Sequence, residues 1–165
     1  EGFDLAIRIG PVGQQALVAR RIAETQLVCC AAPAYLASRP PLLTPDDLQH
    51  HECFAYTYAA TASAWTFEAR DGTRHTPRII FRHRANNGSL LSAMAVAGVG
   101  ISLEPDFIVA ADVRAGRLVR VLPDYQPPRS PISAVYPSRR HLSAKVRTFV
   151  DFLAARYAGA AEWSL

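Results

Sequence analysis

One short segment of the sequence combines residue types that could bind a small anion. Asn86, Asn87, Gly88 and Ser89 follow an expected strand over 78–84 and lead into an expected helix over 89–97. Asn87 can cap that helix, and the free backbone N–H groups and the dipole at a helix start favour a carboxylate. The same residues could instead act only as a cap and a turn, so the segment has a binding interpretation and a purely structural one.

The strand that leads into this segment is expected to carry a basic face. Ile79 and Phe81 occupy odd positions, whereas Arg78, Arg82 and Arg84 occupy even positions. Because successive side chains of a strand point to opposite faces, this alternation predicts one apolar face and one arginine-rich face.

Cysteines and histidines raise the separate question of thiol or metal chemistry. Cys29 and Cys30 lie inside an apolar run, where free cysteine commonly acts as a small core residue. Their adjacency suits neither a disulfide framework nor metal-ligand spacing. His50 and His51 with Cys53 could in principle bind a metal, but loop histidines this close more often cap or face solvent. We therefore expect no catalytic residue, no metal, no cofactor and a reducing, cytoplasmic location.

The elements that must position these residues alternate between strands and helices. Strands are expected over 5–9, 16–22, 26–31, 78–84, 99–103, 118–122 and 132–136, with a hairpin around Asp71 and Gly72. Helices are expected over 32–36, 44–48, 89–97, 105–115 and 143–157. This order predicts an α/β fold with a mostly parallel sheet. The turn at 23–25 and the proline-rich connector at 127–131 are candidate boundaries between lobes.

Composition narrows the class of protein. The chain has 165 residues, of which 50% are hydrophobic and 19% charged, so disorder is excluded and a core can form. No apolar run is long enough for a membrane span. The net charge of +4 is too small to decide for or against nucleic-acid binding. The opening residues show no secretory signal pattern, and we expect a piece of a longer chain.

The order and spacing of several short motifs resemble the effector-binding domain of LysR-type transcriptional regulators. No single motif is specific, but together they cover nearly the whole chain. The motifs lie at 4–8, 17–21, 32–36, 44–48 with His51, 86–88, 97–101 with Pro105, 116–119 and 135–143. The tail over 149–153 resembles the branch of the family called CrgA-like.

This resemblance implies a fold like the type 2 periplasmic binding proteins, with two α/β lobes joined by crossover strands and an effector in the cleft. It assigns 1–24 to part of lobe I, 25–129 to lobe II and 130–165 to the return to lobe I with the C-terminal helix. Lobe I is expected to be truncated, and the N-terminal winged helix-turn-helix to be absent. Regulators of this family are expected to be homo-oligomers.

The resemblance also implies a set of effector-binding residues. They are Arg8, Asn86, Asn87, Gly88, Ser89, Glu104 and Pro105. Arg8 ends the first strand and could pair with a carboxylate bidentately or form a salt bridge; Pro11 and Val12 could line the cleft rim. Glu104 departs from the family pattern, which more often has an apolar residue before this proline. It could hold a cationic group, hydrogen-bond a hydroxyl or pair with an arginine.

The function that the resemblance implies is effector sensing without catalysis. A small metabolite, with a carboxylate among the candidates, would bind between the lobes and modulate a DNA-bound regulator. DNA would be contacted only through the absent N-terminal domain, and no membrane partner is expected. A secreted solute-binding protein shares this fold but needs an export signal, so the upstream coding sequence separates the two. A thiol-dependent enzyme, the third hypothesis, requires a reactive Cys29 or Cys30.

Overall fold

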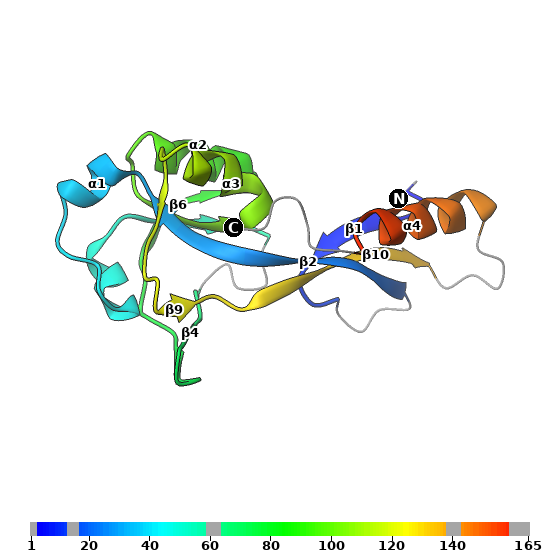
Figure 1. The fold of residues 1–165 in the computed structure, drawn as a ribbon, viewed down its shortest axis with the longest axis horizontal. Helices are drawn as coiled ribbons and strands as arrows, with labels where there is room; N and C mark the ends of the chain where they lie inside the picture. Colours follow the sequence, from blue (N-terminus) through cyan, green and yellow to red (C-terminus); the bar gives the residue numbers. More distant parts are fainter. Residues whose placement is uncertain (1–2, 13–16, 59–63, 138–142, 159–165) are drawn as a thin grey trace. The chain divides into compact units, whose positions relative to one another are not determined.

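The computed structural model describes residues 3–12, 17–58, 64–137 and 143–158. The chain forms two compact units. The first comprises Glu1–Thr25 and Arg129–Ser164, and the second comprises Gln26–Pro128. Figure 1 shows the elements of both units along the chain. In the part of the chain that the structure describes, no helix is long and apolar enough to cross a membrane.

The first unit is a small antiparallel sheet covered by one helix. Strand β1 (Ala6–Ile9) pairs antiparallel with β10 (Arg129–Pro137), which lies next to β2 (Leu17–Ala31) in the strand order. Helix α4 (Ala144–Arg156) has apolar residues at helical spacing, and Val146 and Val150 pack with Ile22 and Ala134. The Ser143 Oγ accepts a hydrogen bond from the Val146 N–H at 3.3 Å, so the predicted cap of this helix is confirmed.

The second unit is built on a mixed sheet. Its strand order is β2, β7 (Ile101–Pro105), β3 (Cys53–Tyr56) and β6 (Phe81–Ala85), and the two-residue β8 (Val119–Arg120) also pairs with β2. Strand β3 runs parallel to β6 and β7, but β2 runs antiparallel to β7 and β8. The prediction of a mostly parallel sheet is therefore wrong. An unbroken apolar run indicates burial on both faces, and it does not fix the direction of the neighbouring strand.

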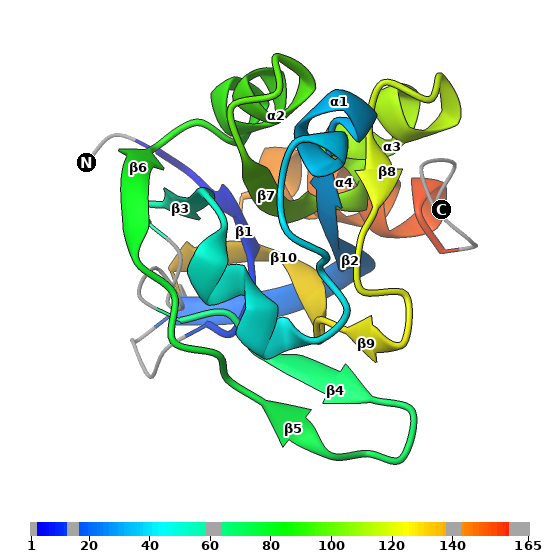
Figure 2. The ribbon, with the colours of Figure 1, turned by 90° about the vertical axis from the view of Figure 1, so that its left-hand side faces the viewer.

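Helices and a hairpin cover the two faces of this second sheet (Figure 2). On one face, α2 (Gly88–Val96) and α3 (Asp106–Arg114) bury a cluster that includes Cys30, Phe54 and Leu91. The other face carries α1 (Pro33–Ala37), the 3-10 helix η1 (Pro45–His50) and the three-stranded sheet of β4 (Phe67–Ala69), β5 (Arg74–His75) and β9 (Tyr125–Gln126). Trp65 and Phe67 are buried in the cluster on this second face, as their place beside the predicted hairpin suggests.

The turn expected at 23–25 is wrong, because β2 is a single strand of 15 residues that runs through it, although the two units divide next to it, between Thr25 and Gln26. Ala23, Glu24 and Thr25 contain no glycine or proline to break the strand, and Thr25 is 1% exposed. The strand contributes its first part to one unit and its last part to the other.

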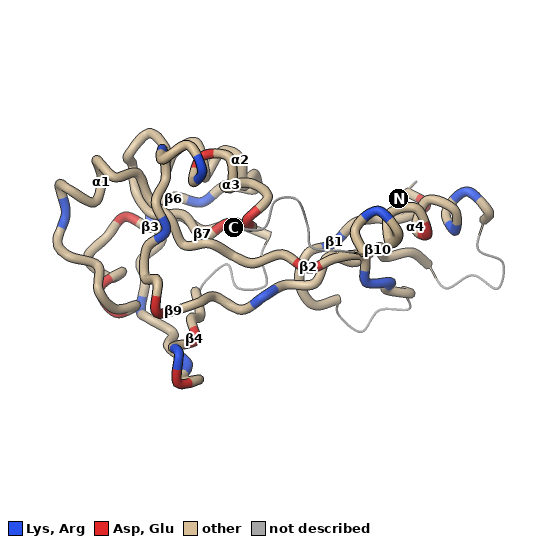
Figure 3. Tube along the Cα trace, in the orientation of Figure 1, with Lys and Arg blue, Asp and Glu red and all other residues tan. Residues whose placement is uncertain are grey.

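The strand expected over 78–84 is confirmed only from Phe81 onwards, because β6 spans Phe81–Ala85. In β6, Arg82, His83 and Arg84 are exposed, while Arg78 precedes the strand. Acidic residues accompany the basic ones in both units (Figure 3), and Arg82 itself lies 3.8 Å from a Glu52 carboxylate oxygen. The charge is thus distributed in mixed pairs, most of them exposed. The basic pair Arg139 and Arg140 lies outside the described residues.

Candidate functional site

The segment between β6 and α2 forms a capped helix start. The Asn87 side-chain oxygen accepts hydrogen bonds from the backbone N–H groups of Ser89 at 2.9 Å and Leu90 at 3.3 Å. Asn86, Asn87 and Ser89 are exposed, whereas Gly88, the first helical residue, is buried. The predicted cap is therefore confirmed. The Asn87 side chain already accepts from two of the backbone N–H groups in the first turn to which an anion could bind.

Glu104 and Pro105 end β7 and precede α3. Val28 lies opposite Glu104 and Leu27 opposite Pro105 in the antiparallel pairing with β2. Glu104 is 3% exposed, which is unusual for a carboxylic acid, while Pro105 is partly buried. The strand therefore carries a buried acid close to the chain segment that opens α3.

Gly88 and Glu104 meet at the start of α2, although 16 positions separate them in the sequence. A Cβ atom built on Gly88 would lie 2.5 Å from Oε2 of Glu104 and 2.7 Å from Cδ1 of Ile108. Real Cβ atoms essentially never show such distances, so the ends of the Glu104 and Ile108 side chains occupy the space that a side chain at position 88 would need. The fold thus places the acid against the first turn of α2.

The Glu104 carboxyl group lies at the start of α2, beside Gly88 and the end of the Ile108 side chain. No ion pair or hydrogen bond joins this carboxyl to any of the residues that the structure describes, so pairing with an arginine is not observed there. Desolvation by burial raises the pKa of Glu104 to about 8. The side chain is therefore largely protonated at neutral pH, and it can donate as well as accept a hydrogen bond.

Arg8 belongs to the first unit, whereas the other six predicted site residues belong to the second. It is exposed in β1, where it lies opposite Ser133 of β10. Pro11 is exposed and Val12 partly buried, and both lie in the same unit as Arg8. The participation of these three residues in a common site with α2 stays a prediction.

A cavity of about 230 Å³ lies elsewhere in the second unit, and sequence reasoning did not find it. It contains none of the predicted site residues. Its lining residues are Leu27, Trp65, Thr66, Phe67, Glu68, Arg74, Leu103 and Pro128. Leu103 and Glu104 are consecutive in β7, so their side chains point to opposite faces of the sheet. The only sequence signal for this cavity is the pair of aromatic residues beside the hairpin.

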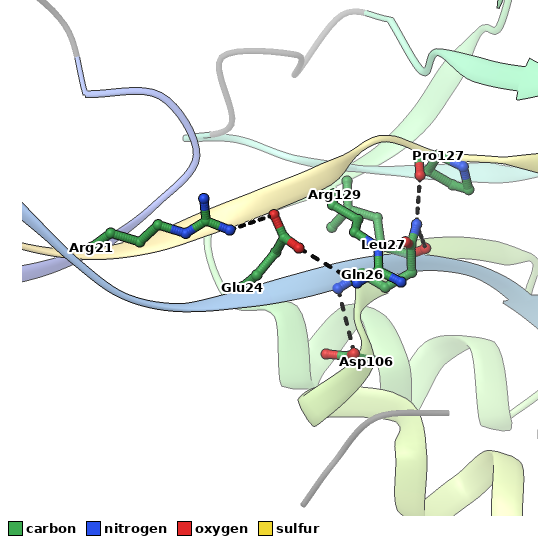
Figure 4. Close-up of polar contacts among 7 residues, drawn as sticks. All are labelled: Arg21, Glu24, Gln26, Leu27, Asp106, Pro127 and Arg129. Carbon is green, nitrogen blue, oxygen red and sulfur yellow. Dashed lines mark hydrogen bonds and ion pairs between the residues drawn. The ribbon is translucent and has the colours of Figure 1, made fainter. Parts of the chain in front are cut away.

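Side-chain hydrogen bonds tie together the chain segments near Gln26 (Figure 4). The Gln26 side-chain amide donates to the carbonyl oxygens of Pro127 and Leu27, and its backbone N–H donates to the Asp106 carboxylate at 3.4 Å. In the first unit, Glu24 accepts from Arg21 at 2.8 Å and from Arg129 at 3.4 Å. These contacts hold neighbouring segments of each unit in place.

The cysteines and histidines form no metal site in the described part of the chain. Cys29, Cys30 and Cys53 are free thiols, and all three are buried. Burial raises the pKa of Cys30 to about 11 and that of Cys53 to about 12, and it also raises the pKa of Cys29. Such thiols are poor nucleophiles because the thiolate is the reactive form.

His51 also serves the core. Its Nδ1 lies 3.3 Å from the Tyr35 hydroxyl, which accepts a hydrogen bond from the Glu52 N–H at 2.9 Å. Burial lowers the pKa of His51, with a smaller contribution from Arg39. The arrangement joins α1 to the segment that leads into β3.

The comparison with known families decides the class of this fold. Residues 1–158 match the family model of the LysR substrate binding domain. The chain belongs to the LysR family.

Relatives and solved structures agree with this assignment. The HTH-type transcriptional regulator PtxR of Pseudomonas aeruginosa is 40% identical over 151 residues, which are 92% of this chain and 48% of that protein. The regulatory domain of CrgA from Neisseria meningitidis matches with a TM-score of 0.78 at 27% identity, covering 93% of this chain and 74% of that one. The regulatory domain of AphB in Vibrio vulnificus matches with a TM-score of 0.77 at 28% identity, and the match covers 93% of this chain and 75% of that one.

The LysR assignment confirms the fold class predicted from the sequence, which is α/β and similar to the type 2 periplasmic binding proteins. The match to CrgA also agrees with the branch that the tail of the chain suggests. This LysR-family chain spans about half the length of the curated regulators that it matches.

Proposed function

We propose that this chain is the sensing part of a bacterial transcription regulator and that its second unit binds a small metabolite at the start of α2. The observation that carries the proposal is the juxtaposition of a capped helix start with a buried acid that has no partner among the described residues. The positive end of the helix dipole and a polar group in an apolar setting are features that orient small ligands.

The proposed role is regulation and not catalysis. The effector shifts a conformational equilibrium of the regulator only by the difference in its affinity for the two states. Two features favour a role without catalysis. The thiols are buried and have raised pKa values, and the named relatives are transcriptional regulators. DNA binding and oligomer formation would belong to the whole regulator.

A ligand screen tests this function. A library of small metabolites is added to the 165-residue chain, and thermal unfolding is recorded with and without each compound. A ligand that binds only the folded chain raises the midpoint of unfolding, by an amount that increases with its concentration. The proposal expects at least one such ligand, and the same compound should change DNA-dependent transcription by the whole regulator. It fails if no compound binds while the regulator still responds to its metabolite signal.

A further inference from the structure

The cavity of about 230 Å³ in the second unit combines a buried aromatic wall with an exposed polar rim. Trp65 and Phe67 line the wall, and these residues are only 4% and 0% exposed. Glu68, Arg74 and Pro128 also line the cavity, but they are exposed, so the cavity is accessible from solvent on their side. A small molecule can therefore reach the aromatic wall without unfolding the unit.

This cavity is separate from the site that we propose at the start of α2. Cys29 lies opposite Leu103 in the pairing of β2 with β7, and Leu27 is two positions from Cys29, so these three side chains share one face of the sheet. Glu104, the next residue of β7, points to the other face, which α2 and α3 cover. A ligand in the cavity therefore binds on the face of the sheet away from α2.

The volume and the lining of the cavity suit a single aromatic ring. Pockets for drug-sized ligands usually measure about 300–1,000 Å³, whereas an apolar cavity of about 150 Å³ can already hold benzene. The volume of about 230 Å³ thus accommodates one ring with a short substituent. The rings of Trp65 and Phe67 lie edge to face with centroids 6.4 Å apart, and a ligand ring can add further contacts of this kind. Leu27 and Leu103 provide apolar contact from the sheet.

The rim determines which charge the substituent can carry. Nε of Arg74 lies 3.8 Å from Oε2 of Glu68, and the two side chains are 80% and 56% exposed. These opposite charges leave the rim without a net charge, so the attraction of a charged ligand to one residue is offset by repulsion from the other. A charged ligand would also lose part of its hydration. A neutral hydroxyl group can donate to the Glu68 carboxylate and accept from the Arg74 guanidinium.

We propose that this cavity is a second ligand site, which binds a single-ring aromatic molecule that carries an uncharged hydroxyl group. The ring lies against Trp65 and Phe67, and the hydroxyl lies at the rim beside Glu68 and Arg74. This inference goes beyond the proposed function, because it adds a site that the ligand at α2 does not use. Either site can therefore fail without the other.

Four compounds that share one ring test the proposal: benzyl alcohol, toluene, benzoate and benzylamine. Each is titrated at neutral pH into the 165-residue chain, and binding is followed through the methyl resonances of Leu27 and Leu103. Nuclear Overhauser contacts between these methyl groups and the ring protons then locate the bound ring. We expect benzyl alcohol to bind about tenfold more tightly than benzoate and benzylamine, because only its substituent is uncharged and can hydrogen-bond to both rim residues.

The substitution Glu68→Gln tests the rim without touching the core. A neutral amide is a weaker acceptor than a carboxylate, so the affinity for benzyl alcohol should fall about threefold, whereas that for toluene, which has no hydroxyl, should not change. Benzoate should gain affinity, because Arg74 is then unopposed. Asp124→Asn is the matched control. Asp124 pairs with Arg70 at 2.7 Å, is 63% exposed and does not line the cavity.

The outcomes decide the proposal without bearing on the site at α2. Saturable binding of benzyl alcohol with contacts to Leu27 and Leu103, and selectivity that changes in Glu68→Gln but not in Asp124→Asn, would support it. It is overturned if benzyl alcohol does not bind, or if the ring makes no contact with these two leucines. Tighter binding of benzoate or benzylamine to the wild-type chain would also overturn it, as would the same selectivity in the wild type and Glu68→Gln.

Discussion

Glu104 links the stability of the second unit to pH. Its folded-state pKa of about 8 lies above the ordinary value of 4.5, so the folded chain holds a proton that the unfolded chain releases between these values. The protonated Glu104 side chain therefore contributes fully to the free energy of unfolding below about pH 4.5. This contribution is lost as the pH rises towards 8. The direction is opposite to that of a carboxylate in a salt bridge.

Replacing Glu104 with Gln should remove this dependence. The difference in unfolding free energy between the wild-type chain and Glu104→Gln should change by about 1 kcal/mol per pH unit between pH 5 and 8, with the wild type losing stability relative to the variant. Urea unfolding at several pH values measures this difference. Parallel stability curves for the two proteins would show that Glu104 is ionised in the folded chain.

A side chain at position 88 would have to displace the ends of the Glu104 and Ile108 side chains. Ala normally stabilises a helix relative to Gly, but the clash with Glu104 and Ile108 predicts that Gly88→Ala destabilises the chain by about 1–3 kcal/mol. Part of this loss should be recovered in the double variant with Glu104→Ala, because the carboxyl group is then absent. A double-mutant cycle from denaturant unfolding provides the measurement. Additive effects would argue against contact between the two residues.

The cysteines should resist alkylation. Cys29, Cys30 and Cys53 are each 3% exposed or less, and burial raises their pKa values. Labelling by iodoacetamide at pH 7.5 should therefore be slow in the folded chain and fast in urea, which mass spectrometry can follow. One thiol that reacts in the folded chain as fast as in urea would reopen the thiol-enzyme hypothesis.

Helix α2 depends on its cap more than on the residue before it. Asn87 accepts from two backbone N–H groups, whereas no side-chain hydrogen bond of Asn86 is observed among the described residues. We expect Asn87→Ala to lower the unfolding free energy by about 1 kcal/mol, and Asn86→Ala to change it by less than about 0.5 kcal/mol. Equal effects of the two substitutions would show that the cap contributes little.

Local signals in the sequence predict most elements of the fold. Asn87 and Ser143 cap the two helices that they were expected to cap, and Thr44 with Asp47 forms a capping box at η1. These signals lie within a few residues of the structure that they specify, so a sequence pattern can show them.

Features that depend on distant segments could not be predicted in the same way. The continuity of β2 through Glu24 and Thr25 depends on its neighbours in space, and strand direction depends on how the chain returns to the sheet. The contact between Gly88 and Glu104 joins separate elements. The sequence offered only one signal for it, an acid at the end of an apolar strand. Part of the candidate site could therefore be named in advance, but its packing could not.

The whole chain is a member of the LysR family with mixed surface charge and two compact units. Several of its charged residues form exposed ion pairs, which contribute little individually to stability. The core clusters of each unit therefore provide most of the stabilisation. The regulatory response that we propose would require the longer protein to which the matched relatives correspond.

Ligand mapping by nuclear magnetic resonance tests the central claim most directly. Backbone amide shifts of the 165-residue chain are assigned and then followed during titration with each compound that raises its unfolding temperature. The account predicts that for at least one compound the largest shifts include Asn86, Gly88 and Ser89, together with Glu104 and Asp106. Saturable binding that leaves these residues unchanged for every compound, for instance because it is confined to the cavity lined by Trp65 and Leu103, would contradict it.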